Sequence, residues 1–217
     1  IHSIAGLILF DLILIAGEII LTILIFFYRD PERKIPLNNK LILSPADGKI
    51  IYIKEIEKGE VPLTVKGDNK YRLTELTGTE LVKEGKYLIG ICMNYLDVHI
   101  NRAPLKGKIE KIIYQPGKFI SLGKPEGVLK NERQTIVFST EQFRLGIVQI
   151  ASRLVRRIVS FVQEGEEVEA GQRIGTIKFG SQVDVVIPQR ENLELKIRVN
   201  DVVRAGQTPL AIIKEEE

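Results

Sequence analysis

The chain has 217 residues, 44% of them hydrophobic, which is enough for one domain with a sizeable core, or for one domain and an anchor. Its formal net charge of only +3 argues against nucleic acid or another strong polyanion as its main partner. The single cysteine, Cys92, excludes an internal disulfide framework and fits a reducing compartment.

The N-terminal stretch from Ile4 to Tyr28 is almost entirely apolar. A helix needs about 20 mostly apolar residues to cross a bilayer, and this stretch is long enough, although Asp11 and Glu18 are costly at mid-bilayer. Aromatic residues at 26–28 are followed by basic ones, the order expected on the cytoplasmic side of a cell membrane. We therefore expect residues 1–28 to be a membrane-associated hydrophobic segment; the alternative is a buried helix of a soluble domain.

Beyond Tyr28 the sequence changes to short runs rich in β-branched residues, which are separated by Gly and Pro. Runs of this kind are typical of β-strands, and the clearest are at 49–53, 87–91, 108–114 and 135–138. Long helical periodicity is scarce in this part of the chain. Residues 29–217 therefore predict a mainly β domain.

A weak internal repeat refines the fold prediction. Segments 162–175 and 199–210 both contain a turn, a valine, two residues and Gly-Gln before an apolar strand. This pattern is typical of barrel-sandwich hybrid domains such as biotinyl and lipoyl carriers, and its glycines suit turns that need a positive φ. A carrier also needs a modified Lys, usually in a Met-Lys-Met or Asp-Lys-Ala context, and neither tripeptide occurs here.

Three polar positions far apart in the chain carry possible chemistry. Ser181 follows Gly180 directly after an apolar run, and a serine oxygen in this position can attack the preceding carbonyl group. Asp47 lies in the turn 44–48, and His99 is one of two histidines. An acid, a base and a nucleophile can form a triad from distant positions. Each residue taken alone also fits a plain turn or a structural role.

Six blocks, taken in order, give this sequence a specific resemblance to the phosphatidylserine decarboxylase proenzymes, in the short form found in archaea and some bacteria. Together they cover nearly the whole chain from about Phe26 to Leu210. The blocks are FYRDPER at 27–33, SPADG at 44–48, DVHINRAP at 97–104, NER at 131–133, IASRLVRRI at 150–158 and FGS at 179–181.

The resemblance implies a pyruvoyl enzyme made as a precursor, with no metal. Ser181 would attack the carbonyl of Gly180, with His99 as general base and Asp47 orienting it. Elimination would leave a pyruvoyl group at residue 181, so that a large chain of residues 1–180 and a small chain of residues 181–217 form. The ketone would condense with the substrate amine as a Schiff base and stabilise the carbanion left by CO2. His99 would then reprotonate the carbon.

The same resemblance implies a membrane phospholipid as substrate, phosphatidylserine or archaetidylserine, and a homodimer. Arginines in the block 150–158, Arg156 among them, suit the lipid phosphate, because guanidinium groups match phosphate geometry; a solvent-facing strand is their alternative role. Arg102, Asn131 and Arg133 are further candidate substrate contacts. Arg102 stands where long-form relatives carry a second histidine, which leaves His99 as the candidate for both proton transfers.

Two other classes of protein remain open at this point. A membrane-anchored carrier or binding module of the hybrid type would keep one intact chain and carry a modified Lys. A membrane-bound serine hydrolase would use Asp47, His99 and Ser181 without self-cleavage, so that a serine-directed phosphonate would label Ser181.

Overall fold

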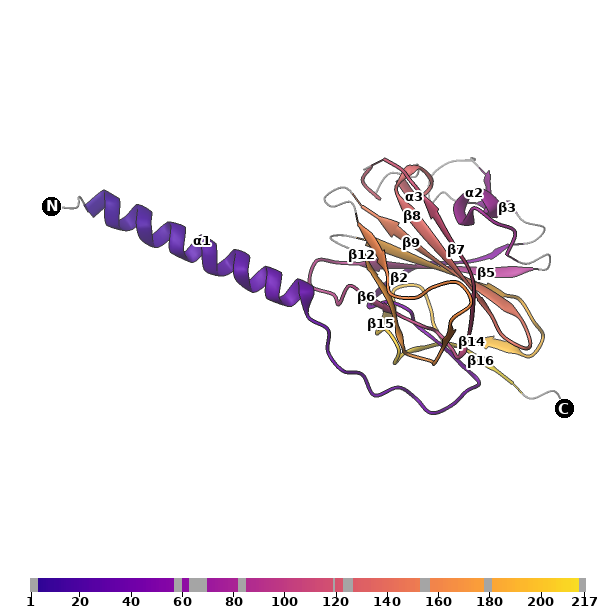
Figure 1. Ribbon diagram of the computed structural model, residues 1–217. Helices are drawn as coiled ribbons and strands as arrows, with labels where there is room; N and C mark the ends of the chain where they lie inside the picture. Colours follow the sequence, from indigo (N-terminus) through magenta and orange to yellow (C-terminus); the bar gives the residue numbers. More distant parts are fainter. Residues whose placement is uncertain are drawn as a thin grey trace.

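The structure is a computed structural model that describes residues 4–56, 60–62, 70–81, 85–118, 120–122, 127–152, 157–177 and 181–214. It is mainly β, as predicted, with one long N-terminal helix (Figure 1). The helices are α1 (Ile4–Tyr28), α2 (Leu73–Thr77) and α3 (Gly127–Lys130). The strands are β1 (Leu41–Leu43), β2 (Gly48–Ile56), β3 (Glu60–Pro62), β4 (Lys70–Arg72), β5 (Lys86–Met93), β6 (Ile100–Arg102), β7 (Gly107–Gln115), β8 (Arg133–Ser139), β9 (Arg144–Ala151), β10 (Ile158–Ser160), β11 (Glu167–Val168), β12 (Arg173–Ile177), β13 (Ser181–Pro188), β14 (Leu193–Leu195), β15 (Val202–Val203) and β16 (Pro209–Ile213).

Helix α1 projects away from the β domain and touches it only near its C-terminal end (Figure 1). Within the described residues, Gly6–Tyr28 is long and apolar enough to cross a membrane, with a mean hydropathy of 2.6. Its apolar side chains are exposed almost throughout, and Phe27 is the exception at 3% exposure. A long exposed apolar surface is unfavourable in water, so this helix indicates association with a membrane.

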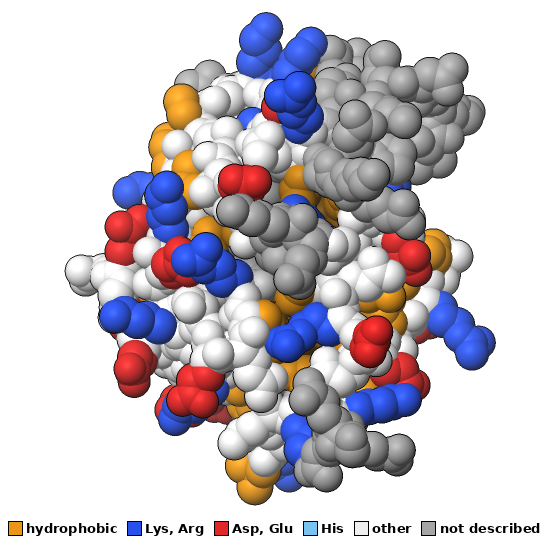
Figure 2. All heavy atoms as spheres, turned by 90° about the vertical axis from the view of Figure 1, so that its right-hand side faces the viewer, with side chains coloured by type: hydrophobic (Ala, Val, Ile, Leu, Met, Phe, Trp, Pro, Cys, Tyr) orange, Lys and Arg blue, Asp and Glu red, His pale blue; other side chains and the backbone are white. Residues whose placement is uncertain are grey.

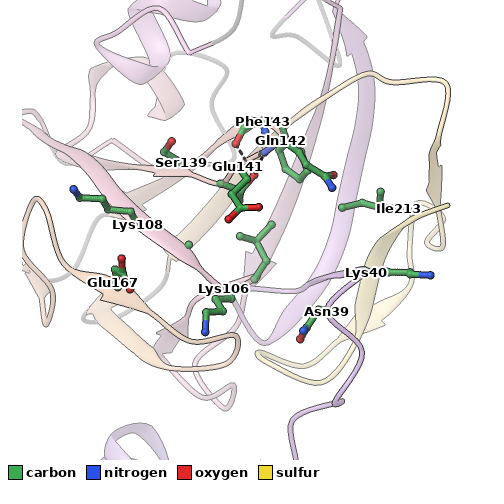
Figure 3. A pocket seen from close by; sticks show the side chains of 13 residues that line it. Asn39, Lys40, Lys106, Lys108, Ser139, Glu141, Gln142, Phe143, Glu167 and Ile213 are labelled. Atoms are coloured by element: carbon green, nitrogen blue, oxygen red, sulfur yellow. Dashed lines mark hydrogen bonds between the residues drawn. The ribbon is translucent and has the colours of Figure 1, made fainter. Parts of the chain in front are cut away.

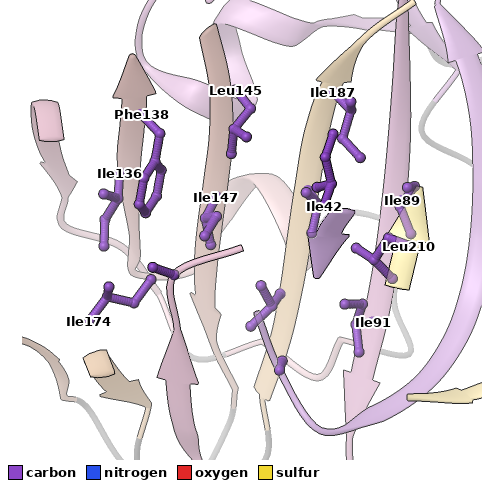
Figure 4. Close-up of a cluster of buried hydrophobic side chains, with 14 of the residues drawn as sticks. Ile42, Ile89, Ile91, Ile136, Phe138, Leu145, Ile147, Ile174, Ile187 and Leu210 are labelled. Atoms are coloured by element: carbon purple, nitrogen blue, oxygen red, sulfur yellow. The ribbon is translucent and has the colours of Figure 1, made fainter. Parts of the chain in front are cut away.

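The β domain is built on one curled antiparallel sheet of eight strands, in the order β11-β7-β8-β9-β13-β5-β2-β15. Two smaller sheets, β1-β16-β14 and β10-β12-β6, lie over its inner face. The core between them is aliphatic and tightly buried (Figure 4), with Ile136, Phe138, Ile147 and Ile187 from the large sheet facing Ile42, Ile174 and Leu210 from the smaller ones. The strands expected from the sequence at 49–53, 87–91, 108–114 and 135–138 lie within β2, β5, β7 and β8.

The outer face of the same sheet is covered as well, because α2 and α3 pack a second apolar cluster against it. As a result all eight residues of the central strand β13 are buried, on both of its faces. Side chains alternate between the two faces of a strand. Val183 and Val185 therefore lie in the inner core, and Val186 lies in the outer cluster.

The internal repeat is a real feature of the fold and confirms the hybrid-like architecture. Strand β11 pairs with the start of β7 in the same way as β15 pairs with the start of β2. The two repeat glycines, Gly171 and Gly206, have φ values of +77° and +70°, which favour glycine. A Cβ atom at these positions would lie 2.3 Å and 3.0 Å from Ile35, so the segment that follows α1 packs directly on both turns.

Candidate active site

Ser181 is the first residue of β13, the strand hydrogen-bonded between β9 and β5. It is only 2% exposed and lies opposite Met93 at the end of β5 and opposite Ala151 at the end of β9. Its hydroxyl group donates a hydrogen bond to Sδ of Met93 at 3.2 Å. The predicted nucleophile therefore sits at the head of the central strand, in mainly apolar surroundings. Gly180 lies outside the described residues.

His99 lies at the same end of the sheet as Ser181. The chain leaves β5 at Met93, opposite Ser181, turns at 94–97 and reaches His99, which is 1% exposed. The backbone carbonyl of His99 accepts a hydrogen bond of 3.3 Å from the N–H of Ile177, the last residue of β12. Ile177 precedes Ser181 by four residues, a span of at most about 14 Å. The fold thus brings the predicted base and nucleophile into one neighbourhood from two directions.

The imidazole of His99 is held in one protonation state. Its Nδ1 lies 2.8 Å from the backbone oxygen of Asp97, and a carbonyl oxygen only accepts, so Nδ1 carries the proton. Its Nε2 is buried and has no partner among the described residues. Burial lowers the pKa of His99 to about 4, against the opposing hydrogen bond to Asp97. The ring of Phe27 packs on the imidazole with a centroid distance of 4.1 Å. At neutral pH the side chain is therefore uncharged, with a lone pair on Nε2 that no described residue engages.

Asp47 is buried near this site but bonds elsewhere. One carboxylate oxygen accepts the N–H of Ala205 at 2.8 Å, and the other accepts Nη2 of Arg33 at 2.8 Å. Neither imidazole nitrogen of His99 bonds to Asp47, since one faces Asp97 and the other has no partner in the described part of the chain. The negative charge of Asp47 still favours the protonated form of His99. Direct orientation of the imidazole by Asp47 stays a prediction.

Arg102, a predicted substrate contact, is buried and bonded to three other residues of the protein. Its guanidinium group donates to the carbonyl oxygens of Gly171 at 3.0 Å and Pro31 at 3.1 Å, and to the carboxylate of Asp30 at 3.1 Å. These bonds fasten the segment after α1 to the turn of the internal repeat. A role in binding substrate stays a prediction.

Asn131 and Arg133 are also engaged by backbone groups. The amide of Asn131 accepts the N–H of Ile120 at 2.8 Å and donates to the carbonyls of Ile120 at 2.7 Å and Ala151 at 3.0 Å. Because Ala151 lies opposite Ser181, Asn131 supports the strand beside the nucleophile. Arg133 donates to four backbone carbonyls, those of Leu76, Glu75, Leu129 and Asn131. Arg156 lies outside the described residues, and substrate binding by all three stays a prediction.

A buried polar network beside Ser181 was missed from the sequence. On the outer face of β13, Gln182 donates to Asp184 at 2.7 Å and to the hydroxyl of Tyr52 at 2.8 Å. Tyr52 in turn donates to the second oxygen of Asp184 at 2.7 Å. Burial raises the pKa of Asp184 to about 6, although both hydrogen bonds and the charge of Lys54 oppose this. The signal available in the sequence was an aspartate set between valines, Val183 and Val185, in a strand-like run.

A second missed network is a chain of buried amides on the inner face. Gln134 donates to Gln149 at 3.1 Å, Gln149 donates to Asn101 at 2.7 Å, and Asn101 donates to the carbonyl oxygen of Pro45 at 3.4 Å. Gln149 lies opposite Val183, two residues from Ser181. This chain ties β9, which flanks Ser181, and its neighbour β8 to the turn that holds Asp47.

A pocket of about 650 Å³ opens at another place in the molecule (Figure 3). It lies between the β6–β7 connection, the β8–β9 turn and the residues before β1, and Lys106, Lys108, Glu141 and Glu167 are among its lining residues. Ser181, His99 and Asp47 do not line it. Its position therefore gives it no part in the chemistry of the candidate site. Within the described residues no cluster of His, Cys, Asp and Glu could hold a metal ion.

The fold and the site thus define a class of protein: a membrane-associated β protein with a buried serine at the head of a central strand and a neutral histidine in the same neighbourhood. A sequence profile of the family described as "Phosphatidylserine decarboxylase" matches residues 20–211. The chain is 43% identical over 189 residues to "Putative archaetidylserine decarboxylase proenzyme" from Methanocaldococcus jannaschii, covering 87% of this chain and 88% of that protein. It is 39% identical over 191 residues to "Phosphatidylserine decarboxylase proenzyme" from Desulfotalea psychrophila, covering 87% of this chain and 78% of that protein.

The chain belongs to the phosphatidylserine decarboxylase family. It is a carboxy-lyase proenzyme of phospholipid biosynthesis, in a family that depends on a pyruvoyl group and whose precursors are cleaved into chains.

Proposed function

We propose that this protein cuts itself between Gly180 and Ser181 and then removes CO2 from the serine head group of a membrane phospholipid, leaving the ethanolamine phospholipid. The substrate is phosphatidylserine or its ether-lipid counterpart archaetidylserine, which present the same head group. The observation that carries the proposal is the buried Ser181 at the head of β13, in the same neighbourhood as a neutral His99 whose Nε2 has no partner among the described residues.

Self-cleavage begins with attack of the Ser181 hydroxyl oxygen on the carbonyl carbon of Gly180, while Nε2 of His99 takes the hydroxyl proton. The amide C–N bond breaks and an ester forms. Loss of the α-proton of residue 181 then expels the Gly180 carboxylate, and hydrolysis of the resulting dehydroalanine releases ammonia and leaves a pyruvoyl group. The products are a large chain of residues 1–180 and a small chain of residues 181–217. Asp47 stabilises the protonated imidazole through its charge.

The surroundings of residue 181 fit a pyruvoyl group, because that group is no larger than serine and its neighbours Met93 and Ala151 are apolar. Once present, the pyruvoyl carbonyl supplies an electron sink for decarboxylation. The hydrogen bonds of β13 to β5 and β9 hold the start of the small chain in place after cleavage. His99, with a pKa of about 4, releases a proton readily from Nε2 once it carries one, and is the acid that we assign to reprotonation.

The membrane arrangement follows from the N-terminal segment. We assign residues 1–28 to a membrane-associated segment and residues 29–217 to the catalytic domain. The aromatic residues at the end of α1, followed by Arg29 and Arg33, support a catalytic domain on the cytoplasmic face. A homodimer is part of the proposal on the ground of the family resemblance.

Release of labelled CO2 tests this function directly. Purified protein in detergent would receive phosphatidylserine or archaetidylserine labelled with 13C at the head-group carboxylate. We expect labelled CO2 from the wild-type protein and none from Ser181→Ala. The ratio of the wild-type rates on the two lipids reports the preference for ester or ether tails. A cleaved protein that released no CO2 from either lipid would contradict the proposal. An intact protein with a phosphonate-labelled Ser181 would indicate a hydrolase, and one with a modified Lys would indicate a carrier.

A further inference from the structure

We infer that the turn formed by residues 94–97, here called the 94–97 turn, is a second membrane-contact element that enters the lipid interface beside α1 and carries the active site to the depth of the head groups. The inference rests on the proposed function for the role of His99. The partner that we propose for the 94–97 turn is a lipid surface.

The tip of the 94–97 turn is formed by two large exposed side chains. Tyr95 is 51% exposed and Leu96 is 60% exposed, although the residues on either side of the turn, Met93 and Val98, are buried. Single exposed apolar residues are ordinary on protein surfaces. An adjacent Tyr and Leu at the tip of a turn instead match the residues that enter a bilayer interface, where a tyrosine ring keeps its hydroxyl in contact with water.

The turn presents these two side chains rigidly. The carboxylate of Asp97 accepts the N–H of Asn94 at 2.8 Å, and the amide oxygen of Asn94 accepts the N–H of Leu96 at 2.8 Å. A backbone bond of 3.1 Å from Asp97 to Asn94 closes the turn. The two polar side chains are therefore turned back onto the backbone, and the tip projects Tyr95 and Leu96.

The turn is also fastened to the end of the membrane helix. Arg29 donates to the carbonyl oxygen of Leu96 at 2.5 Å and to that of Phe26 at 2.6 Å, and its guanidinium group lies over the Phe26 ring. Phe26 and Tyr28 are 50% and 56% exposed. The exposed surface of the 94–97 turn thus continues that of the last turn of α1. If α1 lies in a bilayer with this end at the interface, the 94–97 turn lies there as well.

This surface leads directly to the catalytic histidine. His99 follows Leu96 by three residues, and Phe27, which lies between the exposed Phe26 and Tyr28, packs on the His99 ring. The face turned away from α1 is different in character, because Lys, Arg, Asp and Glu side chains are interspersed over it and hydrophobic areas are small (Figure 2). That charged face suits water. The imidazole of His99 therefore lies directly behind Phe27, beneath the surface that we place at the lipid interface.

A single tryptophan would report the position of the turn, because the natural chain contains none. We would compare Leu96→Trp with Gln142→Trp, both in the uncleaved Ser181→Ala background and both bound to vesicles of phosphatidylcholine and phosphatidylserine. Gln142 is an exposed residue of the β8–β9 turn, at the opposite end of those strands from Ala151 and Arg133. Acyl-chain-brominated phosphatidylcholine would then replace the plain lipid.

We expect the emission of Leu96→Trp to shift to shorter wavelength on binding and to be largely lost with the brominated lipid, and that of Gln142→Trp to stay unchanged. Emission of Leu96→Trp that is insensitive to the brominated lipid, in protein that sediments with the vesicles, would overturn the inference. Self-cleavage and CO2 release do not enter this measurement, so it can fail while the proposed function stands, or succeed while that function fails.

A kinetic comparison gives a second readout with the cleaved enzyme. Tyr95→Ser combined with Leu96→Ser should raise KM for phosphatidylserine in vesicles several-fold, and should leave kcat and the activity on a short-chain, monomeric phosphatidylserine unchanged. Unaltered KM on vesicles would overturn the inference. Equal losses on both substrates would also overturn it, because they would show a general effect on the active site.

Discussion

His99 combines two properties that a general base needs in a buried site. Its Nε2 has no partner in the described part of the protein, and its Nδ1 proton is fixed by the carbonyl oxygen of Asp97. Burial of the ring against Phe27 disfavours the charged form, so the pKa falls to about 4. The imidazole is therefore a weak base, but one that is available over the whole physiological pH range.

The pH dependence of self-cleavage should reflect this lowered pKa. The neutral form of His99 accepts the serine proton, so the rate should be constant from pH 8 to about 5 and fall only as the pH approaches 4. Precursor made by cell-free synthesis and transferred to buffers between pH 4 and 8 would give the rate from the appearance of the small chain on gels.

Phe27→Ala is the matched variant for this measurement. Removal of the ring admits water to the imidazole, so its pKa should rise toward 6.5 and the fall in rate should move to higher pH by the same amount. A rate that already halves near pH 6.5 in the unaltered chain would contradict the assignment of a buried, neutral base.

At the scale of the elements, the central position of β13 explains how a cleaved chain stays together. All eight residues of the strand pair with β5, and Ser181–Val186 also pair with β9, so the start of the small chain is held by the large chain on both sides. Its inner face carries Ser181, and its outer face carries Gln182 and Asp184. The bonds of Tyr52 to this outer face add a side-chain link from β2.

Tyr52→Phe should therefore destabilise the β domain. It removes the hydroxyl that donates to the buried Asp184, and a buried acceptor left without its partner costs about 1–3 kcal/mol. Urea unfolding in detergent would show this as a lower midpoint, with the Ser181→Ala background keeping the protein as one chain. Tyr95→Phe, on an exposed tyrosine of the 94–97 turn, is the control and should unfold like the parent. Equal midpoints for Tyr52→Phe and Tyr95→Phe would rule out a structural contribution of the network.

The sequence predicted elements better than it predicted contacts. β-branched runs identified the four strands named above, and the repeated Gly-Gln turns indicated the hybrid-like fold, because both signals are local in the chain. The partners of side chains depend on how distant segments meet. Nothing near Asp47 in the sequence indicates that Arg33 and the N–H of Ala205 occupy its carboxylate, or that Phe27 covers His99. The predicted substrate contacts Arg102 and Arg133 likewise find backbone carbonyls that only the fold supplies.

At the scale of the whole molecule, an exposed apolar helix projects from one side of the β domain, and the face of the domain turned away from this helix carries charges of both signs (Figures 1 and 2). The formal net charge of +3 gives only weak attraction to an anionic membrane. Association should therefore depend on burial of the apolar surface of α1 and not on surface charge.

The dependence on apolar burial predicts which treatments release the protein from a membrane. Salt screens charge but does not weaken apolar burial, so the protein should sediment with vesicles in 1 M salt, where the Debye length is about 3 Å. Detergent should release it, and deletion of residues 1–25, which keeps Phe27, should leave the β domain in the supernatant. Release of the full-length chain by salt alone would contradict a hydrophobic anchor.

The central claim is that Ser181 becomes the catalytic group, and the mass of the purified protein under denaturing conditions tests it most directly. The account predicts two chains divided between Gly180 and Ser181, with a small chain that lacks a free amino terminus and carries a carbonyl reducible by borohydride, and it predicts one intact chain for Ser181→Ala. A wild-type protein that decarboxylates the lipid as a single chain of 24.5 kDa, or a Ser181→Ala protein that is still cut at this position, would contradict it.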